Sequence, residues 1–157
     1  MINIIAAYSE NRVIGCNGKI PWDLPDDKQH FKQLTTGNVV VMGRKTYEEI
    51  HRPLPNRETV VISSNKTYDG CVNVRSFEEA LRLYSGRNIF IAGGERLYRE
   101  TLHLADKIYV TKILKNISGD RYFPIFDESL FTILTDEYVE GEIPHRYITY
   151  KRITEKR

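Results

Sequence analysis

The stretch Val39-Val40-Val41-Met42-Gly43-Arg44-Lys45-Thr46 decides the fold. Its four leading apolar residues predict a strand that is buried on both faces, as the strands of parallel sheets are. Gly43 then opens a turn into a short helix predicted over residues 45–50, which Arg52-Pro53-Leu54-Pro55 ends. A buried strand that turns directly into a helix is the repeating unit of parallel α/β sheets.

The same alternation continues on both sides of this stretch. Upstream, residues 2–8 predict a buried strand, and Pro25 fits the first position of a helix that stops at Thr36-Gly37-Asn38. Downstream, Ser76 and Glu79 form a capping box for one helix, and Gly93-Gly94 precedes another that runs to about His103. Further strands are predicted over residues 59–62, 71–74, 88–92 and 107–114, with a final antiparallel pair over 130–140 and 145–153.

This pattern predicts an α/β fold with three αβα layers. Its mainly parallel twisted sheet has about eight strands and an antiparallel C-terminal edge. A length of 157 residues suits a single domain over residues 1–157.

Composition narrows the functional classes. With 41% hydrophobic and 28% charged residues, the chain reads as an ordinary soluble globular protein. A net charge of +2 without long basic runs gives no indication of nucleic-acid binding, and no apolar run approaches a membrane span. The N-terminus enters a strand at once and leaves no room for a signal peptide. Cys16 and Cys71 are expected as free thiols, and the four histidines lack metal-ligand spacing, so we expect a cytosolic protein without a metal.

One carboxylate in Pro21-Trp22-Asp23-Leu24-Pro25-Asp26-Asp27-Lys28-Gln29-His30-Phe31-Lys32-Gln33-Leu34 stands out. Phe31 and Leu34 lie four and seven residues after Asp27, so Asp27 shares the apolar stripe of its helix. Both aspartates suit the positive end of a helix, which is one interpretation. The other is that Asp27 lines a pocket and binds a cationic or amidine-like ligand, because ionised groups resist leaving water.

Three strand ends carry groups that suit phosphates, and parallel strands bring their carboxyl ends to one edge. They are Gly43 to Thr46, Ser63-Ser64 with Arg75 further on, and Gly93-Gly94 followed by Glu95, Arg96, Leu97 and Tyr98. A Walker-type loop is excluded, because its glycine spacing is absent. The basic residues favour NADP over NAD. Arg57, after a proline-fixed stretch, is either a solvated loop residue or a carboxylate ligand.

The chain resembles bacterial, stand-alone dihydrofolate reductases over essentially its whole length. The resemblance rests on the order and approximate spacing of Arg12-Val13-Ile14-Gly15, Pro21-Trp22-Asp23-Leu24-Pro25, Val41-Met42-Gly43-Arg44-Lys45-Thr46, Arg52-Pro53-Leu54-Pro55-Asn56-Arg57, Ala92-Gly93-Gly94 and Gly119-Asp120. It implies reduction of dihydrofolate by NADPH, with hydride passing from C4 of NADPH to C6 and a water-borne proton to N5, in the service of one-carbon metabolism.

The resemblance also implies roles for individual residues. Asp27, Trp22 and Thr111 would be catalytic, with Asp27 binding N3 and the 2-amino group of the pterin and hydrogen-bonded by Thr111. The other substrate contacts would be Ile5, Ala7, Phe31, Ile50, Leu54 and Ala92 as apolar walls, and Arg57 with a weaker Arg52 at the glutamate tail. Diaminopyrimidine or diaminopteridine antifolates would bind at Asp27, and the enzyme would be a monomer.

For the cofactor, the resemblance implies a 2′-phosphate site at Arg44, Ser64 and Arg75, and a pyrophosphate site at Thr46 and residues 94–98, with a cis peptide at Gly93-Gly94. Residues 9–24 would form a lid over the nicotinamide, propped by Asp120. The remaining cofactor contacts would be Ala7, Ile14, Gly15, Asn17, Gly18, Lys19, Ile20, Gly43, Lys45, Ser63 and Ala92.

Four residues depart from the family pattern: Ile20, Lys28, Glu49 and His51. They bear on inhibitor affinity more than on activity. Two alternatives remain: an NADPH reductase of similar fold, such as the ribosylaminopyrimidine reductase of riboflavin synthesis, and a regulatory nucleotide-binding module. The first would not need Asp27 together with Arg57, and the second would need neither a buried acid nor a mobile lid.

Overall fold

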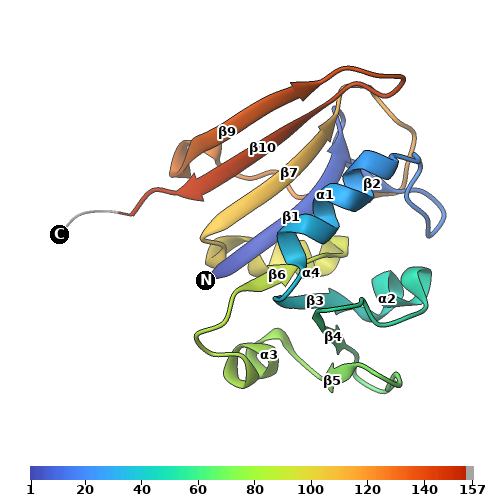
Figure 1. The fold of residues 1–157 in the computed structure, drawn as a ribbon, viewed down its shortest axis with the longest axis vertical. Coiled ribbons are helices and arrows are strands. Elements are labelled where there is room, and N and C mark those ends of the chain that lie inside the picture. Colours follow the sequence, from blue (N-terminus) through green and yellow to red (C-terminus); the bar gives the residue numbers. More distant parts are fainter. Residues whose placement is uncertain (155–157) are drawn as a thin grey trace.

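A computed structural model of the chain describes residues 1–154 and builds them around one large sheet (Figure 1). Within these residues, eight strands lie in the order β5-β4-β3-β6-β1-β7-β10-β9. The six strands from β5 to β7 are parallel to one another, whereas β10 is antiparallel to both β7 and β9. The fold predicted from the sequence is therefore confirmed. The bounds are β1 (Ile2–Ser9), β3 (Val39–Gly43), β4 (Glu58–Ile62), β5 (Val72–Val74), β6 (Ile89–Ile91), β7 (Lys107–Ile113), β9 (Phe131–Val139) and β10 (His145–Arg152).

Helices cover both faces of the sheet because side chains alternate along each strand. Ile4 and Val41 pack in one cluster with residues of α3 (Phe77–Leu83) and α4 (Glu95–Thr101). Their neighbours Ile5 and Met42 face the other way, toward α1 (Pro25–Thr35) and α2 (Arg44–Ile50). In Figure 1, α1 crosses in front of the sheet and α4 lies behind it.

Two helix starts confirm the local predictions. Pro25 is the first residue of α1, and Asp26 and Asp27 follow in the first turn. The Ser76 hydroxyl accepts a hydrogen bond from Glu79 N at 3.2 Å, as a capping residue should. The Glu79 carboxylate, however, accepts from Arg75 N at 2.9 Å, one residue before the position expected in a capping box.

Two other predictions need correction. No strand is predicted within residues 9–24, but they contain β2 (Val13–Gly15), which pairs antiparallel with β8 (Arg121–Tyr122) in a separate small sheet. Strands of three and two residues are too short to show an alternating pattern in the sequence. The helix expected to reach His103 leaves the α conformation after Thr101 and continues as a 3₁₀ turn, η1 (Leu102–Leu104); a second turn, η2 (Glu128–Leu130), precedes β9.

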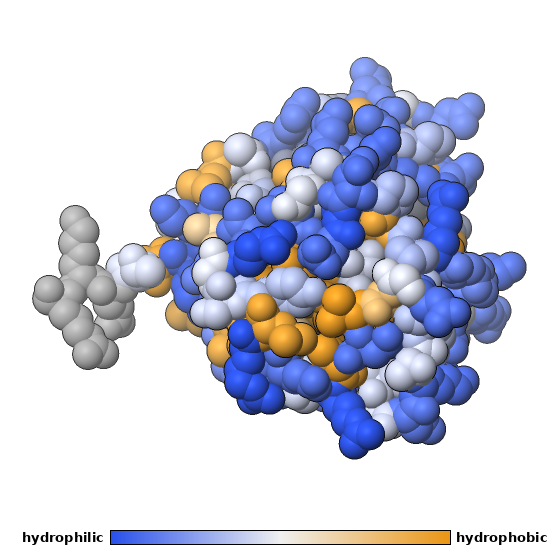
Figure 2. Space-filling model, turned by 60° about the horizontal axis from the view of Figure 1, so that its bottom comes forward, coloured by the Kyte–Doolittle hydropathy of each residue, from blue (hydrophilic) through white to orange (hydrophobic). Residues whose placement is uncertain are grey.

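The remaining observations concern the surface, the two cysteines, and the features that would mark a membrane span or a metal site. On the face drawn in Figure 2 most residues are hydrophilic, with hydrophobic residues gathered near its centre. Cys16 and Cys71 are free thiols. No helix among residues 1–154 is both long and apolar enough to cross a membrane. Across the same residues, His, Cys, Asp and Glu side chains form no group of three that could hold a metal ion.

Gly119 holds the small sheet in close contact with the chain that precedes β8. A Cβ atom at Gly119 would overlap Val13 Cγ1 and lie 2.5 Å from Gly15 O. We expect Gly119→Ala to lower the free energy of unfolding by about 1–3 kcal/mol, the usual cost of overpacking a well-filled site. Denaturant titration measures this change. Gly141→Ala is the matched control, since a Cβ there has nothing within 4 Å, and equal loss in both variants would contradict the account.

Candidate active site

The centre of the site is a hydrogen bond between α1 and β7. Thr111 Oγ1 donates to Asp27 Oδ1 at 2.6 Å, although the two residues are 84 positions apart in the sequence. Thr111 is buried, and its neighbours in the sheet are Ala7 of β1 and Tyr147 of β10. The Asp27 carboxylate therefore faces the sheet near the carboxyl ends of β1 and β7, as expected of a ligand-binding edge in a parallel sheet.

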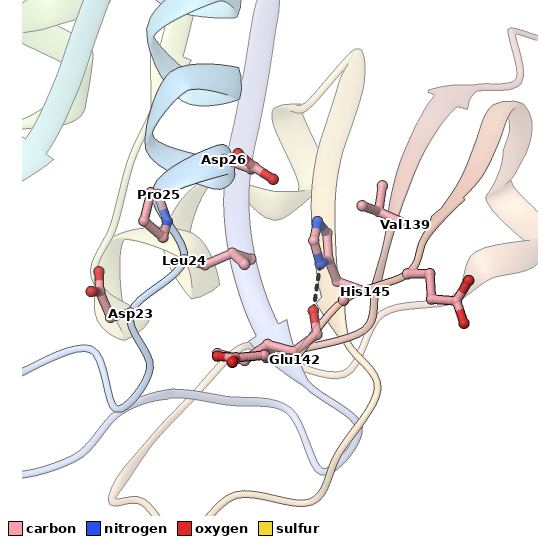
Figure 3. Close-up of a pocket in the computed structure, with 10 residues that line it drawn as sticks. Asp23, Leu24, Pro25, Asp26, Val139, Glu142 and His145 are labelled. Atoms are coloured by element: carbon pink, nitrogen blue, oxygen red, sulfur yellow. Dashed lines mark hydrogen bonds between the residues drawn. The ribbon is translucent and has the colours of Figure 1, made fainter.

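The adjacent residue, Asp26, points elsewhere. It borders a hollow of about 190 Å³ between the start of α1 and the connection from β9 to β10 (Figure 3). His145 also borders this hollow, and its Nδ1 donates to Ile143 O at 2.8 Å. The two aspartates thus have different environments: Asp26 is exposed, whereas Asp27 is half-buried and bonded to Thr111.

Burial shifts the ionisation of Asp27. It raises the pKa of Asp27 above its usual value of 3.8, because a carboxylate ion is poorly solvated there. The Thr111 hydrogen bond opposes this rise first, and the nearby imidazoles of His30 and His145 oppose it less. His30 stacks on Tyr147 with 3.9 Å between ring centroids, so it too is held on this side of α1.

This shift predicts how stability depends on pH. Because the folded protein binds the Asp27 proton more tightly than the unfolded chain, the contribution of Asp27 to stability is present in acid and is lost as pH rises through its folded pKa. We therefore expect Asp27→Asn to unfold at a higher temperature than the parent protein at pH 7. The gain should disappear well below pH 3.8, where both side chains are neutral. Thermal unfolding across this range tests the prediction, and an Asp27→Asn protein less stable at pH 7 would refute it.

The predicted apolar walls lie together beside Asp27. One hydrophobic cluster contains buried Ile5 and half-buried Phe31, Ile50, Leu54 and Ala92. Ala7 is half-buried and pairs with Thr111 across the sheet. The structure thus brings five of the six wall residues into one cluster and places the sixth next to the Asp27 partner.

Arg57 lies beside this cluster, next to Phe31. Its Nε donates to Pro55 O at 2.9 Å and its Nη1 to Thr35 Oγ1 at 3.1 Å, while Nη2 has no hydrogen-bond partner within residues 1–154. Its guanidinium lies over the Phe31 ring at 5.9 Å. These contacts hold the side chain in place and leave one edge of the guanidinium for a carboxylate. Arg52 is exposed.

Two of the predicted phosphate-binding strand ends meet at the same edge of the sheet. Gly43 N donates to Gly93 O at 2.9 Å, and the Gly93-Gly94 peptide is cis, as the resemblance implied. A Cβ atom at Gly94 would lie 3.3 Å from Thr46 Oγ1, so a side chain there would crowd the Thr46 hydroxyl. A glycine turn facing a hydroxyl and the start of a helix suits a bound phosphate.

Arg44 has partners that the sequence did not reveal. Its Nη1 donates to Glu48 Oε1 at 3.0 Å, and Glu48 also accepts from the Tyr68 hydroxyl at 2.7 Å. Lys66 Nζ lies 3.8 Å from the same carboxylate. The Arg44–Glu48 spacing of four residues could have signalled this pair, but Tyr68 lies in a loop without a pattern.

Some predicted cofactor residues have their side chains in the core. Leu97 and Tyr98 are buried, and the Tyr98 hydroxyl donates to Ile5 O at 2.8 Å. The Tyr98 hydroxyl also lies close to Gly93, 3.3 Å from the position that a Cβ atom would take there. The Ser63 hydroxyl accepts from Lys66 N at 3.1 Å within its own turn. Arg96 is exposed and paired with Glu100 at 2.9 Å, and Ser64, Arg75 and Lys45 are exposed.

The 9–24 segment is held at its base. Cys16 and Lys19 exchange backbone hydrogen bonds, Asp120 N donates to Gly15 O at 3.0 Å, and Asn17 N donates to Asp120 Oδ2 at 3.3 Å. The predicted prop residue therefore contacts the segment. Ile14 and Trp22 are half-buried, whereas Asn17, Gly18, Lys19 and Ile20 are exposed.

Two departures from the family pattern have simple surroundings. Lys28 forms an exposed ion pair with Asp23 at 3.3 Å. His51 ends α2 in the left-handed conformation, with φ of 65°, a position that glycine usually takes.

Comparisons with known proteins show which family this chain resembles in sequence and fold. Residues 1–153 match the family model described as dihydrofolate reductase. The chain is 43% identical over 140 residues to the dihydrofolate reductase of Bacillus subtilis, covering 87% of this chain and 83% of that protein. It is 36% identical over 155 residues to the enzyme of Staphylococcus aureus, covering 94% and 95%. A solved structure of the Enterococcus faecalis enzyme, complexed with NADP(H) and RAB-propyl, superposes with a TM-score of 0.90 at 37% identity, covering 97% of this chain and 96% of that one.

Proposed function

This chain belongs to the dihydrofolate reductase family and is an NADPH-dependent reductase of dihydrofolate, and we propose that it delivers hydride from C4 of NADPH to C6 of 7,8-dihydrofolate while N5 gains a proton. The product is 5,6,7,8-tetrahydrofolate. The observation that supports this proposal most strongly is the half-buried Asp27 carboxylate, held by Thr111 beside an apolar cluster.

Asp27 binds the pterin in this proposal. Its two oxygens accept from N3 and the 2-amino group, and the Thr111 hydroxyl fixes the direction of the carboxylate. Because N5 lies on the other ring of the pterin, Asp27 does not protonate it directly, and water brings the proton. The negative charge of Asp27 instead makes the bound ring more basic.

Arg57 binds the other end of the substrate. Its guanidinium is held by Pro55 O and Thr35 Oγ1, so a substrate carboxylate meets a side chain that is already ordered. The α-carboxylate of the glutamate tail is the group proposed to bind there, with Arg52 in a weaker role. Between the two ends lie Ile5, Ala7, Phe31, Ile50, Leu54 and Ala92 as walls that exclude water.

NADPH fits the glycine edge of the sheet. We assign its pyrophosphate to Thr46 and the turn from Gly93 into α4, and its 2′-phosphate to Arg44, Ser64 and Arg75. The 9–24 segment, with Trp22, closes over the nicotinamide and excludes water from the reacting atoms.

We further propose that residues 1–157 form one domain, because the sheet joins strands from both ends of the described chain. The enzyme is proposed to act as a monomer in the cytoplasm, where its two free thiols stay reduced. Antifolates with a diaminopyrimidine or diaminopteridine ring are proposed to bind at Asp27.

One assay tests the function. Loss of NADPH absorbance is followed with dihydrofolate as the sole acceptor, and again with the ribosylaminopyrimidine substrate of riboflavin synthesis. We expect turnover with dihydrofolate and none with the second acceptor. Turnover with the second acceptor alone would favour the related reductase, and NADPH binding without turnover of either would favour a nucleotide-binding module.

A further inference from the structure

Glu95 connects the Gly93-Gly94 turn, at the start of α4, to the short strand β8. It is the first residue of α4, directly after the Gly93-Gly94 turn. Its Oε1 accepts from Tyr122 N at 2.6 Å, and its Oε2 accepts from Arg99 Nη2 at 3.3 Å. The side chain is only 25% exposed. The carboxylate is therefore directed at β8, and no hydrogen bond joins it to a backbone N–H of its own helix within residues 1–154.

The strand β8, which donates a hydrogen bond to Glu95, also pairs with the 9–24 segment. Tyr122 lies opposite Val13, and Arg121 lies opposite Gly15 in the small sheet. One residue earlier, Asp120 holds Gly15 and Asn17 by hydrogen bonds. The cofactor turn is thus joined through one carboxylate and one short strand to the base of this segment.

We propose that Glu95 is a positioning residue that ties the base of the 9–24 segment to the cofactor turn, so that NADPH binding and ordering of this segment reinforce each other. The inference rests on the proposed sites for NADPH and for the closing segment. An ionised acceptor makes a stronger hydrogen bond than a neutral one, so this single contact can hold a two-residue strand. Arg99 balances the charge of Glu95, which would otherwise lie next to the cofactor phosphates.

The first test compares three variants by steady-state kinetics. We expect Glu95→Ala to raise KM for NADPH about tenfold, as loss of a charged hydrogen bond does, and to lower kcat less. Glu95→Gln keeps an oxygen that accepts from Tyr122 N but loses the charge, so its KM for NADPH should lie between that of the parent protein and that of Glu95→Ala. Glu78→Ala is the control, because Glu78 is an exposed carboxylate in the first turn of α3, a helix outside the proposed cofactor site.

The second test reads the 9–24 segment directly through Trp22, the single tryptophan of the chain. With saturating NADPH, we expect lower fluorescence anisotropy of Trp22 in Glu95→Ala than in the parent protein or Glu95→Gln. Should Glu95→Ala not fold, Glu95→Asp keeps the charge but is one methylene shorter, and the same changes are expected.

Three outcomes would overturn the inference. They are an unchanged KM for NADPH in Glu95→Ala, equal defects in Glu95→Gln and Glu95→Ala, or a lower thermal midpoint without any change in Trp22 anisotropy. A parent protein that does not reduce dihydrofolate would instead contradict the proposed function, so the two failures are distinguishable.

Discussion

Replacing Asp27 with asparagine is expected to lower kcat/KM for dihydrofolate at pH 7 by about 100-fold or more. This corresponds to roughly 3 kcal/mol of barrier, the size of a lost electrostatic contact to a transition state. Asparagine can still accept from Thr111, so the geometry should persist while the negative charge disappears. What is lost is the charge that raises the basicity of the bound pterin.

The pH dependence separates this role from simple loss of binding. In acid, dihydrofolate arrives already protonated, so we expect the activity of Asp27→Asn to rise as pH falls. A pH–rate profile from pH 5 to 9 measures this rise. Asp26→Asn is the matched control: it removes a neighbouring charge on the same helix, but Asp26 faces the hollow shown in Figure 3. A flat profile for Asp27→Asn, or an equal loss in Asp26→Asn, would count against the assignment.

Replacing Arg57 with glutamine should weaken substrate binding rather than chemistry. We expect KM for dihydrofolate to rise about 10- to 100-fold, the cost of losing a paired, charged hydrogen bond, with kcat within a few-fold of the parent value. The same contacts that fix Arg57, to Pro55 O and Thr35 Oγ1, make it a preorganised ligand for a carboxylate.

The control for Arg57 is a substrate instead of a variant. A dihydropterin without the glutamate tail should have the same kcat/KM with the parent protein and with Arg57→Gln. If the variant loses activity equally on both substrates, Arg57 supports the fold and does not recognise the tail.

The sequence predicted the parts of the fold that depend on local pattern. The valine-rich strand before Gly43, Pro25 at the start of α1 and Ser76 at the cap of α3 all lie where expected. In each case neighbouring residues fix the conformation. The small sheet of β2 and β8 was missed because its pairing joins residues more than a hundred positions apart, with only two or three residues on each side.

In the candidate site, too, features that depend on local spacing could be predicted from the sequence, whereas contacts between distant elements could not. The stripe shared by Asp27 and Phe31 followed from helical spacing, but its contact with Thr111 came only from the family resemblance. No pattern in the sequence showed that Tyr98 would turn its hydroxyl to Ile5 O in the core, or that Glu95 would reach β8. Such contacts depend on how distant elements pack, and the residue types alone allow several partners.

The proposed function requires the Asp27 carboxylate to face a ligand that lies among the apolar walls. Titration calorimetry with a diaminopyrimidine antifolate at pH 7 tests this without requiring turnover. We predict that the parent protein and Asp26→Asn bind it with equal affinity, and that Asp27→Asn binds at least about 100-fold more weakly, as when a buried charged partner is removed. Equal affinity in all three proteins would contradict the account, because the ligand would then not contact Asp27.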